Sequence, residues 1–536
     1  MTNEARQTKE DEQKQAGRGG LFVLVAKVFF ILTGFVQQAL LPRVIGRADY
    51  GALARVSAVT NLFNNVIVSG STQGVSRTVA AAGVHEREAL RASLRAHFGL
   101  ALVATGLLVL AAPAVAYFQG APEVLAPIIA MAAVLFIYGI YAPLVGYING
   151  RRMFARQATL DMAAATLRTF CMLGIGYGFV RHGGSIAHAL GTLPGMLGAT
   201  LGAGLAALGV LLIALKWTGT GSSFDVRPPG VPTVAEYMRL IVPVMVAQLF
   251  VNALMQADIF MVGRYLSLGA LQQVAPLTPS GVARDPATAA NEWVAVYRAC
   301  QLFAFLPYQM LFSVTQVLFP MLAKAKSEEG DGRVAELVAR GSRIGAIVCG
   351  LLVVVIVAMP ESLIRVAYDR DVAAAGAPAL RFLVLGQGAF AMLGLATTIL
   401  ISLGRERAAM TLTALALALL VVCCTVLIPH AAFGRAQIMA TATAAATALA
   451  IALVFGVMTA RKIAGAFVPW KTALRVGILV GAAFGLGSVM PTFGKLVTLV
   501  VAPVLGLAYV VGLVVLGEIG KSDLSLVLSI VRRKKA

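Results

Sequence analysis

Two sets of carboxamide side chains recur at helical spacing within apolar stretches of the sequence. One set recurs at i, i+3 and i+4, and the other at i, i+4 and i+8, so each set occupies one face of a helix. The six residues are Asn61, Asn64, Asn65, Gln248, Asn252 and Gln256. Carboxamides both donate and accept hydrogen bonds. They are therefore suited to binding a ligand that is rich in hydroxyl groups, or to joining neighbouring helices without any ligand.

Further cationic and amide side chains lie within or at the edge of apolar stretches. They are Lys27, Gln37, Arg55, Arg298 and Gln301. Lysine and arginine neutralise phosphate, and amides pair with hydroxyls. Together the two groups predict a cavity that binds a sugar chain attached to a diphosphate. Arg55 has an equal alternative, in which its long side chain extends to the membrane interface.

Two acidic residues within apolar stretches are candidates for ion coupling. Asp161 and Asp258 could each bind a proton or cation that drives transport. The structural alternative pairs Asp161 with Arg168 and Asp258 with Arg264. We expect no metal site and no cofactor, because the five histidines are scattered and the five cysteines lie in apolar stretches.

The elements that must position these residues are transmembrane helices. Of the 536 residues, 59% are hydrophobic and 13% are charged, whereas soluble domains have about 45–50% apolar and about 25% charged residues. So few charges cannot cover a soluble chain of this length. The composition therefore excludes a water-soluble enzyme, and the positions of the basic residues must explain the net charge of +20.

Fourteen apolar stretches are long enough to cross a bilayer, which takes about 20 residues per helix. The expected spans are 21–41, 53–75, 97–118, 124–148, 158–180, 187–215, 234–262, 293–318, 344–366, 380–403, 408–428, 439–457, 473–489 and 496–516. Lys and Arg residues concentrate in every second connector, which predicts that those connectors and both termini are cytoplasmic. The first stretch follows a segment without a basic region, so we expect a retained helix and not a cleaved signal peptide.

Weak internal similarity divides the predicted spans into two repeats. Thr72-Gln73 matches Thr315-Gln316, and Gly150-Arg151 matches Gly404-Arg405. The matches are six spans apart, and an even offset preserves orientation. The predicted parts are a cytoplasmic tail (1–20), an N-lobe of six helices (21–216), a cytoplasmic linker (217–233), a C-lobe of six helices (234–460), two further helices (461–520) and a basic cytoplasmic tail (521–536). The expected fold is an all-α integral membrane protein whose two lobes are related by a pseudo-two-fold axis along the membrane normal.

Several short motifs occur in an order that resembles a known family. The stretch from Leu41 to Gly51 resembles the R-x-L-G-x-x-x-Y-G signature after the first helix of polysaccharide-biosynthesis flippases of the Wzx type. Gly146 to Arg152 resembles the glycine and basic motif after their fourth helix. Ala257-Asp258-Ile259 and the stretch from Tyr297 to Pro320 resemble their motifs in helices seven and eight. The resemblance covers residues 20–325 and extends to the multidrug/oligosaccharidyl-lipid/polysaccharide exporter superfamily.

The resemblance implies a lipid-linked oligosaccharide flippase in the bacterial inner membrane. It implies two lobes that rock about a central cavity and move an undecaprenyl-diphosphate-linked repeat unit to the periplasmic leaflet, for exopolysaccharide or O-antigen synthesis. A glycan polymerase and export machinery are the implied partners. We expect no nucleic acid partner, and a monomer as the functional form.

Two alternatives within the superfamily stay open. A cation-coupled multidrug antiporter would have twelve helices and an acid in the first span, where this chain has none. A lipid II flippase would, by the same resemblance, carry arginine at the position of Gln301 and an arginine-aspartate pair at Thr33-Gly34. A membrane enzyme forms a third class. No connector is long enough for a catalytic domain, so we expect no enzyme activity and no catalytic residue.

Overall fold

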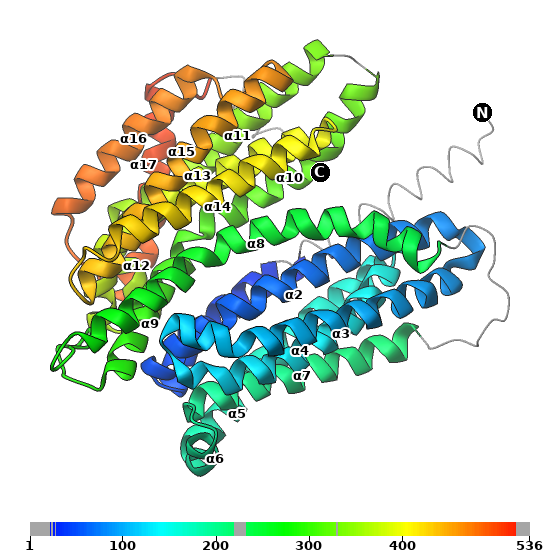
Figure 1. The fold of residues 1–536 in the computed structure, drawn as a ribbon. Coiled ribbons are helices and arrows are strands. Elements are labelled where there is room, and N and C mark those ends of the chain that lie inside the picture. The colour runs from blue at the N-terminus through cyan, green and yellow to red at the C-terminus, as the bar shows by residue number, and fades with distance from the viewer. Residues whose placement is uncertain (1–21, 23–24, 27, 219–231, 329–330, 521–536) are drawn as a thin grey trace. The chain divides into compact units, whose positions relative to one another are not determined.

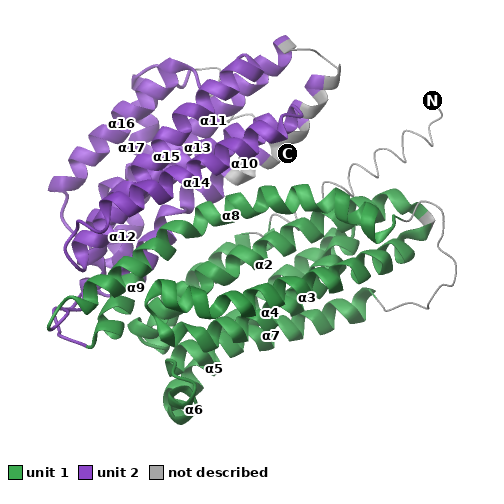
Figure 2. Ribbon diagram, in the orientation of Figure 1, with its two compact units in different colours: residues 1–274, 285–295 green, residues 275–284, 296–536 purple. Residues whose placement is uncertain are grey.

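The computed structural model describes residues 22–520 except 23–24, 27, 219–231 and 329–330. The chain divides into two compact units, which Figure 2 colours separately. Unit 1 comprises residues 1–274 and 285–295, and unit 2 comprises residues 275–284 and 296–536. Both predicted tails, most of the predicted linker and Lys27 lie outside the described residues.

The described part of unit 1 consists mainly of long helices (Figure 1). In chain order they are the first helix (Val28–Val44), α2 (Arg47–Ala82), η1 (Gly83–His85), α3 (Glu86–Gln119), η2 (Pro122–Val124), α4 (Leu125–Gly150), α5 (Phe154–His182), α6 (Gly184–Ala189), α7 (Pro194–Thr218), α8 (Val234–Leu271) and the start of α9 (Pro286–Ala304). Local sequence sets several helix ends. Thr233 and Glu236 form a capping box at the start of α8, and Gly120 ends α3 in the left-handed conformation.

The described part of unit 2 contains the remainder of α9 and eight further helices. They are α10 (Leu306–Glu328), α11 (Asp331–Ala358), α12 (Pro360–Ala367), α13 (Arg370–Ser402), α14 (Glu406–Leu427), α15 (Arg435–Ala464), α16 (Trp470–Val489) and α17 (Lys495–Val515). The most extensive contact within the unit joins α13 to α15. α16 and α17 both pack against α11, so the last two helices are attached to this unit.

The all-α membrane fold expected from the sequence is confirmed. The described residues are helical apart from connectors and one isolated β-bridge between Leu277 and Ala283. Eleven of the described helices are long and apolar enough to cross a membrane, and Val28–Val44 is a shorter apolar helix. α2 and the pair α9–α10 occupy the second and eighth predicted spans, which are among the more polar ones. The helix count is thus consistent with the predicted fourteen.

The eighth predicted span, 293–318, is not one continuous helix. α9 ends at Ala304 and α10 begins at Leu306, on either side of Phe305. Pro307 explains the break, because proline lacks an N–H group and its ring clashes with the carbonyl four residues earlier. Proline is tolerated in the first turn of a helix, so α10 can start there.

Glycines of the family-like motifs allow helices of unit 1 to approach one another closely. A Cβ atom at Gly51 would lie 1.8 Å from the backbone carbonyl oxygen of Asn291 on α9. A Cβ atom at Gly146 of α4 would lie 2.8 Å from the Cβ atom of Val75 on α2. Both distances are far shorter than van der Waals contact, so a larger residue would displace the neighbouring helix. These glycines therefore fix α2 against α4 and α9.

Asp49 of the first motif caps a different helix of unit 1. Its Oδ1 atom accepts the backbone N–H of Met196 over 2.8 Å, in the first turn of α7. The first N–H groups of a helix have no partner within the helix, and the helix dipole favours a negative charge there. The motif aspartate thus joins the start of α2 to the start of α7.

The seventh predicted span, α8, packs against α2 and α3 and belongs to unit 1. In the sequence the same span opens the predicted C-lobe at residue 234. The predicted lobes and the two compact units describe different properties. The lobes reflect an internal repeat in the sequence, whereas the units reflect how the helices pack. The lobe boundaries themselves stay a prediction.

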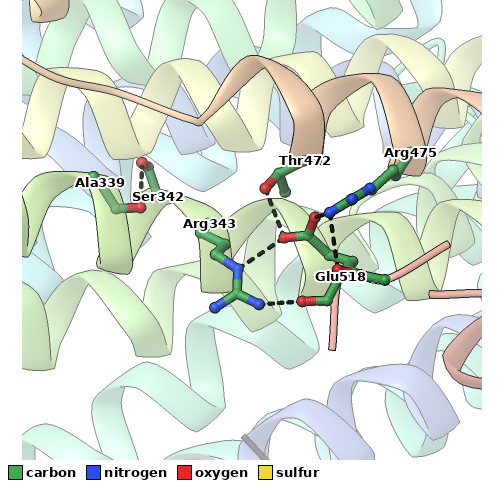
Figure 3. A network of polar contacts seen from close by, with 7 residues as sticks. Ala339, Ser342, Arg343, Thr472, Arg475 and Glu518 are labelled. Carbon is green, nitrogen blue, oxygen red and sulfur yellow. Dashed lines mark hydrogen bonds and ion pairs between the residues drawn. The ribbon is translucent and has the colours of Figure 1, made fainter. Parts of the chain in front are cut away.

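A buried carboxylate in unit 2 attaches the end of α17 to α11 and α16. Glu518 is 5% exposed. Its Oε1 atom accepts hydrogen bonds from Arg343 Nε over 2.7 Å and Thr472 Oγ1 over 2.6 Å, and its Oε2 atom accepts one from Arg475 Nη1 over 2.7 Å (Figure 3). Burial raises the pKa of Glu518, but these hydrogen bonds outweigh burial and hold the pKa below its ordinary value.

Candidate functional site

α2 and α8 pack against each other in opposite directions within unit 1, so that residues later in α2 meet residues earlier in α8. A Cβ atom at Gly70 would lie 3.9 Å from the Cβ atom of Met245, and one at Gly74 would lie 3.6 Å from the Cβ atom of Ile241. Glycines four residues apart give a transmembrane helix a smooth face for close contact. The pair Gly70 and Gly74 therefore places the first half of α8 directly on α2.

The two amide faces predicted from the sequence meet further along this contact. The Asn65 Nδ2 group donates a hydrogen bond to Asn252 Oδ1 over 2.9 Å. The Asn252 Nδ2 group donates in turn to the backbone carbonyl of Gln248 over 2.8 Å. We call the six residues of the two faces the amide row. They are Asn61, Asn64, Asn65, Gln248, Asn252 and Gln256.

Several members of the amide row keep unused hydrogen-bonding capacity. Asn61, Gln248 and Gln256 are half-buried, and their side chains form no hydrogen bond with the part of the chain that the structure describes. The Oδ1 atom of Asn64 is buried and also lacks a partner there. Amides in apolar surroundings are costly unless water or a ligand satisfies them. The row can therefore bind ligand hydroxyl groups while it also joins α2 to α8.

Gln37 joins the first helix to α5. Its side chain is 5% exposed. Thr169 Oγ1 donates to Gln37 Oε1 over 3.2 Å, and Gln37 Nε2 donates to the sulfur of Met172 over 3.3 Å. Both ends of this amide are thus occupied within unit 1, and its predicted contact with a substrate stays a prediction.

Arg55 is enclosed within unit 1. Its side chain is fully buried, and Nη1 donates to the hydroxyl of Ser267 on α8 over 2.8 Å. In this structure the guanidinium therefore reaches no exposed surface, and the alternative in which it extends to the membrane interface does not describe it. Lys27, the predicted cation of the first span, lies outside the described residues.

Arg298 and Gln301 are brought together in unit 2. They lie one turn apart on α9, and Arg298 Nη1 donates to Gln301 Oε1 over 3.1 Å. Gln301 is 1% exposed, whereas Arg298 is half-buried. The buried amide can therefore hold the guanidinium in one orientation.

The acidic candidates lie on separate helices of unit 1. Asp258 on α8 is 2% exposed and accepts the backbone N–H of Ile259 over 2.8 Å, whereas Asp161 on α5 is half-buried. Arg264 donates to the backbone carbonyl of Phe118 and stacks over its ring. No group of three or more His, Cys, Asp or Glu side chains among the described residues could hold a metal ion.

Sequence reasoning missed a buried hydrogen-bond chain beside Gly70 and Gly74. His97 of α3 lies between two hydroxyl groups, with Nδ1 3.1 Å from Ser71 Oγ on α2 and Nε2 2.6 Å from Tyr237 Oη on α8. The G-x-x-x-G spacing was an available signal for the helix contact. These two hydrogen bonds fix the start of α8 to both α2 and α3.

Comparisons with known proteins agree with this architecture. The family model described as polysaccharide biosynthesis protein matches residues 16–326. No curated protein matches the chain. Among solved structures, the lipid II flippase MurJ in an inward closed conformation has a TM-score of 0.69 at 11% identity, over 91% of this chain and 98% of that chain.

Two further solved structures share the fold. An inward-facing multidrug resistance MATE family transporter of the MOP superfamily has a TM-score of 0.57 at 15% identity, over 81% of this chain and 95% of that chain. A MOP superfamily transporter from Pyrococcus furiosus has a TM-score of 0.55 at 14% identity, over 84% of this chain and 96% of that chain. These likenesses show an all-helical transporter fold.

Proposed function

Because the chain belongs to the polysaccharide biosynthesis protein family, we propose that it moves a lipid-linked oligosaccharide across the bacterial inner membrane. The proposed substrate is an undecaprenyl-diphosphate-linked repeat unit for exopolysaccharide or O-antigen synthesis. A transporter fold supports this activity over an enzymatic one, since the similar solved structures are a flippase and transporters.

The amide row is the observation that carries the proposal. Asn61, Gln248 and Gln256 present donors and acceptors that the described part of unit 1 does not use. Sugar hydroxyls also donate and accept, so they match carboxamides better than they match an apolar or purely cationic surface. The row lies within residues 16–326, the part that the family model matches.

The diphosphate of the substrate is proposed to bind cationic side chains outside the amide row. Arg298 is half-buried and is held by the amide of Gln301. A guanidinium in a fixed orientation can form two parallel hydrogen bonds with phosphate oxygens. Lys27 is proposed as the second phosphate-binding cation on the strength of its place in the first predicted span.

Alternating access, with both termini in the cytoplasm, is the proposed mode of transport. Asp161 and Asp258 are the proposed sites for a coupling proton or cation, because acidic side chains within membrane helices commonly have this role. The protein is proposed to act as a monomer and to deliver its product to a glycan polymerase and export machinery.

Reconstitution into proteoliposomes tests the proposed substrate. Fluorescently labelled undecaprenyl-diphosphate oligosaccharide is placed in both leaflets, and an added glycosidase reports the fraction that reaches the outer leaflet. We expect full-length protein to make the protected fraction accessible within the assay time, whereas protein-free liposomes should not.

Two further substrates distinguish the alternatives. Lipid II in place of the oligosaccharide tests the lipid II flippase, and a lipophilic cationic dye under a proton gradient tests the multidrug antiporter. Translocation of the oligosaccharide, at a rate above that of lipid II, supports the proposal. Dye transport without oligosaccharide translocation would assign the chain to the antiporter class.

A further inference from the structure

Arg55 has more hydrogen-bonding capacity than the described part of unit 1 satisfies. Its side chain is fully buried, and Nη1 donates to Ser267 over 2.8 Å. The Nε and Nη2 atoms are also buried, but they have no hydrogen-bond partner in the described part of the chain. Arginine stays protonated in proteins. A full positive charge therefore lies inside the unit with unsatisfied N–H groups, which is costly unless an anion compensates it.

Gln119, the last residue of α3, lies beside Arg55 and is also unsatisfied. Its side chain is fully buried, and neither Nε2 nor Oε1 has a partner among the described residues. Gly263 of α8 marks where the two side chains approach each other. A Cβ atom at Gly263 would lie 3.1 Å from Gln119 Oε1 and 3.6 Å from Arg55 Nε. Because both ends of the amide are unused, Gln119 can turn its NH2 group toward the guanidinium's open side.

Glu123 and Asn291 lie at the edge of this region. Asn291 Nδ2 donates to Glu123 Oε1 over 2.8 Å, and Asn291 Oδ1 is buried without a partner among the described residues. Glu123 interacts with the charge of Arg55 but forms no ion pair with it within the described residues. The unused N–H hydrogens of Arg55 and Gln119 outnumber the unused carbonyl oxygens of Gln119 and Asn291. The region is therefore rich in donors.

We propose that these side chains bind a small monovalent anion of the halide class, held by the guanidinium of Arg55 and the amide of Gln119. A halide accepts several N–H hydrogen bonds at once and places a negative charge in direct contact with the guanidinium, whereas Glu123 forms no ion pair with it within the described residues. A water molecule adds no charge and brings donors of its own to a donor-rich region. The anion would join α2, α3 and α8 where Arg55, Gln119 and Ser267 meet.

The test measures the thermal stability of the purified full-length protein in detergent, with no glycan present. Sodium chloride or bromide replaces sodium gluconate at constant ionic strength, so only the anion changes. A ligand that binds the folded state raises Tm with concentration, and we expect the halides to do so. Arg55→Gln should remove the halide dependence. Arg181→Gln, which changes an exposed arginine on α5, should retain it.

Gly263→Ala is a second variant that keeps the charge of Arg55. Its methyl group would lie against both side chains, so we expect it to raise the halide concentration needed for half of the Tm shift. This variant keeps the test decisive if Arg55→Gln does not fold. Anomalous scattering from bromide in crystals should place the ion beside Arg55.

Two results would overturn the proposal. One is an equal Tm in gluconate, chloride and bromide. The other is a halide effect that both Arg55→Gln and Gly263→Ala retain. Either result would leave water as the occupant of the region. Because no glycan is used, the outcome is independent of the proposed transport function.

Discussion

Asn65 of α2 donates a hydrogen bond of 2.9 Å to Asn252 of α8, and this bond joins two amide faces that lie 187 residues apart in the sequence. Interhelical bonds of this kind contribute about 0.6 kcal/mol on average within membranes. The bond uses only part of the amide row, since the side chains of Asn61 and Gln256 form none with the described residues. The row thus combines a structural contact with unused binding capacity.

A disulfide between α2 and α8 tests whether the two helices move as one body. The change is Gly74→Cys with Ile241→Cys, in a chain whose five native cysteines are replaced by alanine. The Cβ distance of 3.6 Å at this pair falls within the range of about 3.5–4.5 Å that disulfides require. Because α8 packs in unit 1, we expect the oxidised protein to export glycan at the rate of the reduced protein.

A second cysteine pair, placed within unit 2, controls for effects of the oxidant itself on export. Gly456→Cys with Ala396→Cys joins α15 to α13, where the corresponding Cβ distance is 3.8 Å. Mass spectrometry should show disulfide formation in both proteins. If oxidation stops export in the Gly74→Cys/Ile241→Cys variant but not in the Gly456→Cys/Ala396→Cys variant, and a reductant restores it, then α8 leaves α2 during transport.

Gly51→Ala should destabilise unit 1. The added methyl group would lie 1.8 Å from the carbonyl oxygen of Asn291, and overpacking of this kind typically costs about 1–3 kcal/mol. Gly34→Ala is the matched control, because a Cβ atom at Gly34 meets nothing within 4 Å. We expect a lower Tm and a smaller yield of folded protein for Gly51→Ala only, measured by fluorescence-detected size-exclusion chromatography. Equal Tm values for both variants would contradict the close contact between α2 and α9.

Glu518→Gln should weaken the attachment of α17 to α11 and α16. Hydrogen bonds to a charged group contribute about 1.5–3 kcal/mol, and the variant removes the charge that Arg343 and Arg475 share. The pKa of Glu518 is held below its ordinary value in the folded state. Its stabilisation is therefore fully present above the unfolded pKa of about 4.3, and it is lost as pH falls through the folded value.

The measurement for Glu518 is Tm as a function of pH. The wild-type protein should be more stable than Glu518→Gln at pH 7, and the difference should shrink as the pH falls below about 4. Glu406→Gln, an exposed acid at the start of α14, serves as the control. A difference between wild type and Glu518→Gln that does not depend on pH would rule out the carboxylate charge as its cause.

Gln301→Leu should impair export through its effect on Arg298. The change removes the acceptor that holds Arg298 Nη1 at 3.1 Å, so the guanidinium loses its fixed orientation. We expect a several-fold lower export rate with protein abundance unchanged. Gln309→Leu, an exposed amide on α10, should export at the wild-type rate. Wild-type export by Gln301→Leu would remove the positioning role.

The sequence predicted the helical faces but not how they meet. Spacing alone placed Asn61, Asn64 and Asn65 on one face, because the helical period is fixed by local geometry. The pairing of Asn65 with Asn252 depends on how two distant helices pack, and Gly70 and Gly74 were the available signal for that contact. The fold class followed from composition and span length, which are properties of the whole chain.

The environment of Arg55 could not be derived from the sequence. Its position at the edge of a span was compatible with a cavity or with the membrane interface. The structure instead encloses it beside Gln119 and Ser267, which come from α3 and α8. Burial of one side chain depends on neighbours from several helices, and no periodic pattern records them.

Export of the glycan by the double variant Asn61→Leu with Gln256→Leu tests most directly whether the amide row binds the glycan. Leucine preserves bulk and apolar packing but removes two amides that form no hydrogen bond with the described residues, so Tm and abundance should stay near the wild-type values. The measurement is the rate at which undecaprenyl-diphosphate oligosaccharide reaches the outer leaflet of proteoliposomes. We predict at least about a tenfold loss of rate, which corresponds to about 1.4 kcal/mol of lost interaction. Translocation at the wild-type rate by this double variant would contradict the assignment of the amide row to the glycan.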